Sequence, residues 1–199
     1  LTDTKEILDA ITDQSARMEK IDIGKCCVII DASESMIGSD ERKFHPFLTA
    51  LSIVSVLDNV DEVFIEGGMP IQKGPAGSLV LPSGSTKLWK PLLKIASKDI
   101  QNVIIISDGY ENDLKGMFQH TYDFLKKKGV KLNLMHINPV LSTKAKSGTT
   151  RRLISDVDPM SVDNYKFLET KLIFDRMIEG SEIVKKLLIQ KYTKLLGGA

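Results

Sequence analysis

The sequence predicts an α/β fold in which a doubly wound, mainly parallel central sheet is flanked by helices. Short runs of β-branched residues alternate with segments of helical periodicity, which is the rhythm of βαβ units. The run Val103–Ser107 is apolar almost throughout, as expected for a central strand covered on both faces. The 199 residues, of which 42% are hydrophobic and 27% charged, suit one globular domain.

Six runs are predicted to be strands because they are apolar or β-branched and are bounded by turn residues. The stretch from residue 66 to residue 85 is dense in Gly, Pro and Ser, so we expect two connections there with one minor edge strand between them. A second edge strand is expected near the end of the domain. The predicted strands are Cys26–Ile30, Glu62–Glu66, Ser78–Leu81 (edge), Val103–Ser107, Val130–Ile137 and Met160–Val162 (edge).

Helices are predicted where apolar residues recur at spacings of three and four. In 44–57 the predicted buried face comprises Phe44, Phe47, Leu48, Leu51 and Val54, and in 114–128 it comprises Leu114, Met117, Phe118, Thr121 and Leu125. Lys126, Lys127, Lys128 and Gly129 form a C-terminal stop signal for the second of these helices. Further helices are predicted at 87–97, 150–155 (short), 164–178 and 181–196.

Composition limits the classes of function. There are 27 Lys and Arg against 26 Asp and Glu, so bulk charge does not indicate direct binding to nucleic acid. No membrane span and no secretory signal are recognisable in these residues. Cys26 and Cys27, the two cysteines, are neighbours in an apolar run, which predicts reduced, buried thiols and a cytoplasmic location.

Oxygen-bearing side chains follow two of the predicted central strands. After the first strand, one carboxylate and two hydroxyls alternate in Asp31-Ala32-Ser33-Glu34-Ser35, and Asp108 follows the strand Val103–Ser107. Thr86 precedes the helix at 87–97. If these strands are neighbours at the switch point of the sheet, their carboxyl ends bring the five side chains into one crevice. Hydroxyls and carboxylates without imidazole or thiolate suit a hard cation, Mg²⁺ or Mn²⁺, with Ca²⁺ as a further candidate.

The pattern Asp31-x-Ser33-x-Ser35, followed by Thr86 and by Asp108 in SDG, resembles the von Willebrand factor A domain and its metal-ion-dependent adhesion site. The resemblance covers roughly residues 24–178, with a helical extension at 1–23 and an amphipathic helix at 179–199 expected to pack on the domain. It implies a Rossmann-like sheet of order 3-2-1-4-5-6. It also implies that Ser33, Ser35 and Thr86 bind the cation directly or nearly so. Asp31 and Asp108 would act largely through water, and a partner's Asp or Glu would complete the coordination.

Two positions depart from the family pattern. Glu34 stands where glycine is common, and Gly84-Ser85 replaces a common Gly-Gly pair. Glu34 either points into solvent or swings over the ion and blocks the open position. The residues expected to contact a partner around the site are Glu34, Met36, Ser85 and Tyr110.

The expected function is a non-enzymatic, metal-dependent protein-binding module, an intracellular adaptor or assembly factor working with an AAA+ ATPase or a macromolecular complex. One alternative is an RNA-associated module of the Ro type. Another is an Mg²⁺-dependent phosphoryl-transfer enzyme with Asp31 as nucleophile, although Ser33 stands where such sites carry a second Asp. The histidines His45, His120 and His136 are scattered and are interpreted as surface or packing residues. A basic group, Lys144, Lys146, Arg151 and Arg152, is interpreted as a solvated loop.

Overall fold

The computed structural model describes residues 20–74, 77–111, 113–140 and 151–161. The helices predicted at 164–178 and 181–196, most of the extension at 1–23 and the loop at 141–150 lie outside these ranges. Within them, no helix has the length and apolar character needed to cross a membrane.

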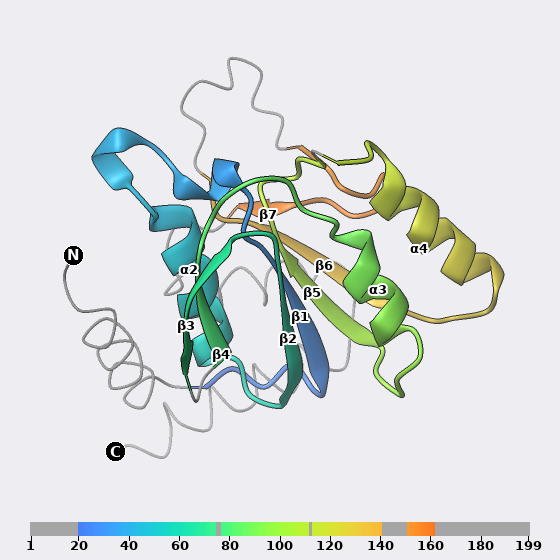
Figure 1. Cartoon of the computed structure of the whole chain (residues 1–199). Helices are drawn as coiled ribbons and strands as arrows, with labels where there is room; N and C mark the ends of the chain where they lie inside the picture. The colour runs from blue at the N-terminus through green and yellow to red at the C-terminus, as the bar shows by residue number, and fades with distance from the viewer. Residues whose placement is uncertain (1–19, 75–76, 112, 141–150, 162–199) are drawn as a thin grey trace, which may run out of the picture. The chain divides into compact units, whose positions relative to one another are not determined.

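The predicted α/β architecture is confirmed by a five-stranded, fully parallel sheet (Figure 1). Its order is β2-β1-β5-β6-β7, so the chain runs outward in one direction from β1 to β2 and in the other from β5 to β7. The order therefore reverses between β1 and β5, the switch point where open α/β sheets bind ligands. The strands are β1 (Cys26–Asp31), β2 (Val60–Glu66), β5 (Asn102–Ile106), β6 (Asn133–Asn138) and β7 (Met160–Ser161).

A strand is present at the predicted position 78–81, but the prediction that it forms an edge of the central sheet is wrong. The chain instead forms an antiparallel hairpin, β3 (Met69–Gly74) with β4 (Gly77–Leu81), which is a sheet of its own rather than a strand added beside β2. The order expected from the resemblance is therefore present without its outermost strand. Gly67 and Gly68, with φ of +83° and +74°, turn the chain at the end of β2 and separate the hairpin from the sheet.

In the part of the chain that the structure describes, three α-helices lie on the two faces of the sheet. Figure 1 shows α2 (His45–Val56) on one face and α3 (Trp89–Ile95) with α4 (Met117–Lys127) on the other. Two short 3₁₀ helices, η1 (Glu34–Ile37) and η2 (Asp40–Arg42), connect β1 to α2. Because β1 and β5 are covered on both sides, they are buried along almost their whole length.

Several details of the predicted helices need correction. Helix α2 buries Phe47, Ala50 and Ile53, whereas Leu48 is 39% exposed, because apolar residues occur all around this helix and do not define one face. In α4 the predicted Phe118, Thr121 and Leu125 are buried, but Leu114 precedes the helix and is 53% exposed. The short helix expected at 150–155 is absent from its described part: residues 151 and 152 are irregular, and bends and a turn follow at 153–157.

The core between the sheet and helices α3 and α4 is built from alternate residues of the strands. Cys27, Ile29 and Ile105 pack there with Leu92 and Phe118. Both cysteines are free and buried, as predicted. Burial raises the pKa of the Cys26 thiol to about 11, so the thiol stays protonated and serves as an apolar side chain.

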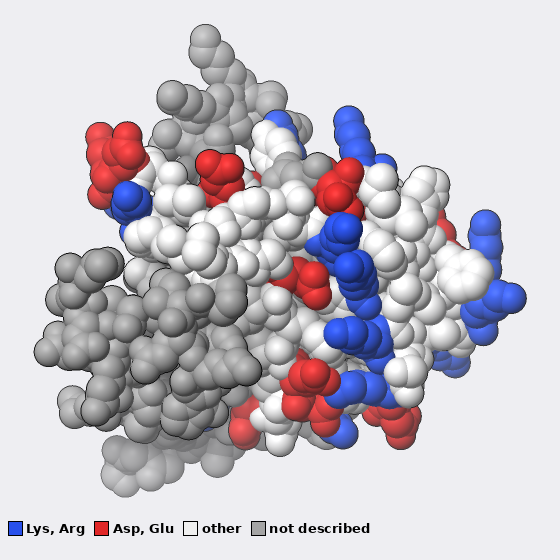
Figure 2. All heavy atoms as spheres, viewed as in Figure 1, with Lys and Arg blue, Asp and Glu red and all other residues white. Residues whose placement is uncertain are grey.

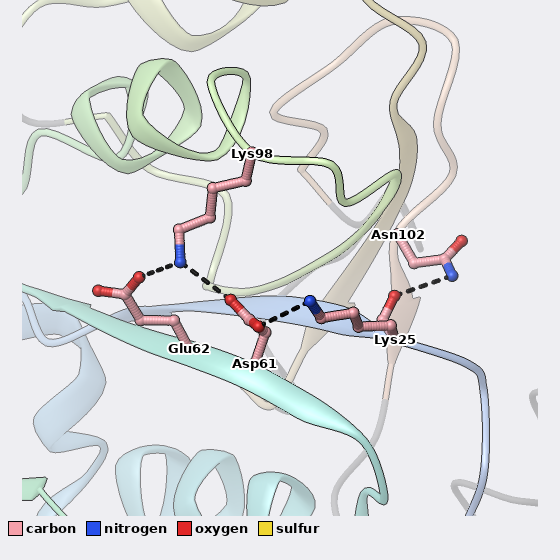
Figure 3. A network of polar contacts seen from close by, with 5 residues as sticks. All are labelled: Lys25, Asp61, Glu62, Lys98 and Asn102. Atoms are coloured by element: carbon pink, nitrogen blue, oxygen red, sulfur yellow. Dashed lines mark hydrogen bonds and ion pairs between the residues drawn. The ribbon is translucent and has the colours of Figure 1, made fainter.

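A polar network connects the strands at the end of the sheet where they begin (Figure 3). The Lys98 ammonium lies 2.9 Å from the Asp61 carboxylate and 2.5 Å from that of Glu62, and Lys25 lies 3.0 Å from Asp61. Asn102 donates to the carbonyl of Lys25 at 3.2 Å. These contacts raise the pKa of Lys98 and lower that of Asp61. They join the starts of β1, β2 and β5, so the ends of these strands are aligned as well.

Candidate functional site

The candidate site lies where β1 and β5 end, at the switch point of the sheet. The two strands are parallel neighbours, and Ile30 is paired with Ile106 in the register. Asp31 and Ser107, one residue further along each strand, therefore meet side by side. Asp108 follows, and its charge acts on Asp31. The expected convergence of Asp31 and Asp108, 77 positions apart in the sequence, follows from this pairing.

Asp31 is fully buried, and each of its oxygens accepts a hydrogen bond. The amide of Ser33 donates to Oδ1 at 2.8 Å, and the Ser107 hydroxyl donates to Oδ2 at 2.8 Å. Burial raises the pKa of Asp31 to about 6, although hydrogen bonds from Ser107 and Ser33 oppose the rise and the charge of Asp108 adds to it. The ionised carboxylate is thus costly here unless positive charge is brought to it.

A chain of hydrogen bonds links Asp31 to the second carboxylate. The hydroxyls of Ser33 and Ser35 lie 2.9 Å apart, and Ser35 in turn bonds the side chain of Asp108. Burial also raises the pKa of Asp108, while the Ser35 hydrogen bond and the positive charge of Arg151 act against the rise. Four of the five predicted metal ligands therefore form one connected group of oxygens.

The fifth predicted ligand, Thr86, lies on the loop between β4 and α3. Its side chain is 3% exposed, and its hydroxyl has no hydrogen-bond partner among the described residues. A Cβ atom placed on Gly67 would come within 2.6 Å of the Thr86 methyl carbon, so the methyl group packs against the backbone of Gly67. A glycine is needed there, both for this approach and for its φ of +83°.

Two backbone hydrogen bonds tie the loop of Thr86 to the loop after β1. The amide of Ser83 donates to the carbonyl of Ala32 at 2.9 Å, and the amide of Glu34 donates to the carbonyl of Gly84 at 3.2 Å. The backbone carbonyl of Ala32 also lies beside Gly67, on which Thr86 packs. The unpaired hydroxyl is therefore held next to the segment that carries Asp31 and Ser33.

The predicted partner-contacting residues divide into two groups. Glu34, Ser85 and Tyr110 are exposed, Tyr110 by 40%, and they surround the buried oxygens. Met36 is fully buried, so its expected contact with a partner is wrong. Met36 lies in the 3₁₀ helix η1, whose tight turn directs it into the core while its neighbours Ser35 and Glu34 face outward.

The structure adds residues to which the sequence analysis gave no role in the site. The Ser107 hydroxyl donates a hydrogen bond to Asp31 and accepts one from the amide of Gly109 at 3.1 Å. Asn138 at the end of β6 donates to the carbonyl of Asp108 at 3.3 Å. His136 Nε2 lies 3.0 Å from the carbonyl of Ser107, and burial lowers the pKa of the imidazole to about 4. Their positions in the sequence could have indicated these residues, because each lies at or near the end of a strand next to the site.

The donor set, rather than any cluster of acids, defines what the site can hold. Among the described residues, no group of three or more His, Cys, Asp and Glu is placed to bind a metal. The arrangement instead offers two carboxylates and three hydroxyls, an all-oxygen set that fits Mg²⁺ or Mn²⁺ better than zinc. The Thr86 hydroxyl has no partner among the described residues, and burial raises the pKa values of both carboxylates.

A line of basic side chains crosses the molecule over α3, as Figure 2 shows, but carboxylates accompany it. Lys98 pairs with Asp61 and Glu62, as described above. Lys87, which precedes α3, lies 3.5 Å from Asp113, and the charges of Lys90 and Lys94 in α3 act on Glu66. Each lysine thus has an acidic neighbour, and the line is not an unbalanced positive surface for a polyanion.

Comparison with known proteins adds no relative: no model of a protein family matches the chain, and no curated protein matches it.

Proposed function

We propose that the protein is a metal-dependent protein-binding module of the von Willebrand factor A type. Asp31, Ser33, Ser35, Thr86 and Asp108 would hold Mg²⁺ or Mn²⁺, and an Asp or Glu of a partner protein would complete the coordination. The free, buried cysteines suit a cytoplasmic adaptor or assembly factor that acts beside an AAA+ ATPase or another large complex.

The unpaired hydroxyl of Thr86 is the observation that carries this proposal. A buried hydroxyl without a partner costs about 1–3 kcal/mol, so folded proteins rarely retain one without a reason. Packing cannot be that reason, because valine would fill the same volume without the cost. A cation bound beside Asp31 and Ser33 would give the Thr86 oxygen a partner.

The two carboxylates support the same conclusion. Asp31 and Asp108 are both buried and repel each other, and both have raised pKa values. A divalent cation would reverse the sign of the local potential and favour the ionised forms. Since the donors are few and partly neutral, the cation would keep Lewis acidity and an exchangeable position for an external carboxylate.

The surroundings of Asp31 support binding over phosphoryl transfer. A nucleophilic carboxylate needs an oxygen that a phosphate can reach, but Asp31 is fully buried and both of its oxygens accept hydrogen bonds. The exposed rim, in contrast, is available to a protein partner. Glu34 belongs to that rim, and its side chain is exposed.

The experiment is a calorimetric titration of the protein with Mg²⁺ and Mn²⁺, repeated on Thr86→Val. The variant keeps the shape of the side chain and removes only the oxygen, so we expect the same fold and at least about tenfold weaker metal binding. Thr121→Val makes the same change at a buried threonine of α4 and should leave metal affinity unchanged. Equal affinities of wild type and Thr86→Val, or no metal binding by wild type, would refute the proposal.

A further inference from the structure

We infer that Arg151, stacked on Tyr110, binds a second acidic side chain of the partner, so that the module selects segments carrying two acidic residues. This inference rests on the proposed function, because the first acidic residue is the one that coordinates the cation. It concerns residues that the metal site does not use.

The stack is close and lies at the edge of the site. The guanidinium carbon of Arg151 is 3.3 Å from the centroid of the Tyr110 ring, and both side chains are exposed. The amide of Tyr110 donates to Oδ1 of Asp108 at 3.0 Å, which fixes the tyrosine relative to that carboxylate. The charge of Arg151 in turn acts on Asp108. The pair therefore stands directly beside a proposed metal ligand.

The backbone also holds Arg151 in this place. A Cβ atom on Gly109 would come within 2.7 Å of the Arg151 carbonyl oxygen, so the two segments are in close contact. Two and three residues further on, Leu153 and Ile154 are buried in the core and anchor the segment. A side chain fixed in this way loses less conformational entropy on binding than a free surface arginine does.

The guanidinium has its hydrogen-bonding edge available. Among the described residues it has the contact with the ring and the attraction to Asp108, but no hydrogen bond. Stacking on an aromatic ring uses the face of the guanidinium and leaves its N–H groups, which lie in the plane, for a carboxylate. The neighbouring Arg152 differs, because it pairs with Asp158 and donates to the carbonyl of Ser155 at 3.3 Å.

Loading the site with metal would increase the demand for an anion at this position. Without the cation, Asp108 supplies negative charge to Arg151. With a divalent cation bound, its two positive charges offset the negative charges of Asp31 and Asp108, so Asp108 no longer balances the charge of Arg151. One carboxylate of the partner is taken up by the cation. A second carboxylate at Arg151 would pair with the guanidinium directly and form two parallel hydrogen bonds with its N–H groups.

The test uses short blocked peptides of Gly and Ser that contain either one Asp or two, with the second at varied spacing. Binding to the whole chain is measured by peptide NMR in saturating Mg²⁺, and substitution by Mn²⁺ identifies the Asp near the metal through its enhanced relaxation. We expect the best two-acid peptide to bind about three- to tenfold more tightly than the one-acid peptide. Arg151→Gln should abolish this advantage while leaving the one-acid peptide bound through the metal.

Matched variants separate the role of Arg151 from a general loss of charge. Arg152→Gln removes the same charge one residue away and should keep the advantage of the second acid. Tyr110→Phe should keep it as well, because the ring remains, whereas Tyr110→Leu should reduce it. Equal binding of one-acid and two-acid peptides by wild type, or the same loss in Arg152→Gln, would overturn the inference. Absence of metal-dependent binding of the one-acid peptide would instead overturn the proposed function.

Discussion

Asp31→Asn should stabilise the metal-free protein at neutral pH, although it removes a predicted metal ligand. The physical reason is the burial of a carboxyl whose pKa rises from 3.8 to about 6 on folding. Between these pH values the folded chain binds the proton more tightly than the unfolded chain does. The stability contributed by this group is therefore complete below about pH 3.8 and is lost as the pH rises through about 6.

The size of the effect follows from the same two values. The rise is about two pH units, and each unit corresponds to about 1.4 kcal/mol, so ionised Asp31 lowers the free energy of unfolding by about 3 kcal/mol at pH 7. Asparagine keeps the acceptor for the Ser33 amide, and its NH₂ group can donate to the Ser107 oxygen. In EDTA at pH 7, Asp31→Asn should therefore be more stable than wild type by up to about 3 kcal/mol.

Urea unfolding, followed by the fluorescence of Trp89, the one tryptophan of the chain, measures this directly. The difference in stability between Asp31→Asn and wild type should grow from pH 4 to pH 7 in EDTA. Saturation with Mg²⁺ should stabilise wild type, by about 2.7 kcal/mol at one hundred times the dissociation constant, and should stabilise the variant much less. Asp99→Asn, at an exposed position, should show neither effect. A variant that is less stable than wild type in EDTA at pH 7 would refute the reasoning.

Three further results are expected. Gly67→Ala should weaken Mg²⁺ binding in calorimetry, because the added Cβ displaces Thr86. Gly84→Ala is the control: Gly84 also has a positive φ but has open space around it, so the substitution should cost only about 1 kcal/mol of stability in urea. Similar metal affinities of the two variants would contradict this reasoning. The ring signals of His136 in NMR should not shift between pH 5 and pH 8, since burial lowers its pKa to about 4; a midpoint in that range would disprove its neutrality. Glu34→Gly should change Mg²⁺ affinity by less than about 0.5 kcal/mol, because the side chain is exposed; a larger loss would make Glu34 a ligand.

Much of the sheet could be predicted because its signals are local. The runs at β1, β5 and β6 are apolar and bounded by turn residues, and the position of a loop after a parallel strand fixes which edge of the sheet it joins. Asp31, Ser33, Ser35 and Asp108 could be grouped on that basis alone. The pairing of β1 with β5 then supplied the one contact that the grouping required.

Other features depend on tertiary contacts, which the pattern of apolar residues in the sequence does not indicate. The burial of Met36 follows from the tight turn of η1, and the exposure of Leu48 from which side of α2 meets the sheet. Ser107 reads as the last residue of an apolar strand, and its role emerges only when Asp31 is placed beside it. Arg151 is a loop residue in the sequence, and only the folded chain brings it onto Tyr110.

Two local rules of protein folding are broken together where β1 and β5 end. In the sheet, apolar side chains pack together and backbone groups form hydrogen bonds. At the end of the sheet where the strands begin, lysines form ion pairs with carboxylates. Where β1 and β5 end, by contrast, two carboxylates are buried close together, and the hydroxyl of Thr86 has no partner among the described residues. Such local costs concentrate at functional sites, since the free energy of ligand binding can offset them. A single hard cation would relieve both costs at once, by attracting the two carboxylates and giving the hydroxyl its partner. The energetics of the metal-free fold thus argue for the same ligand as the chemistry of its oxygens.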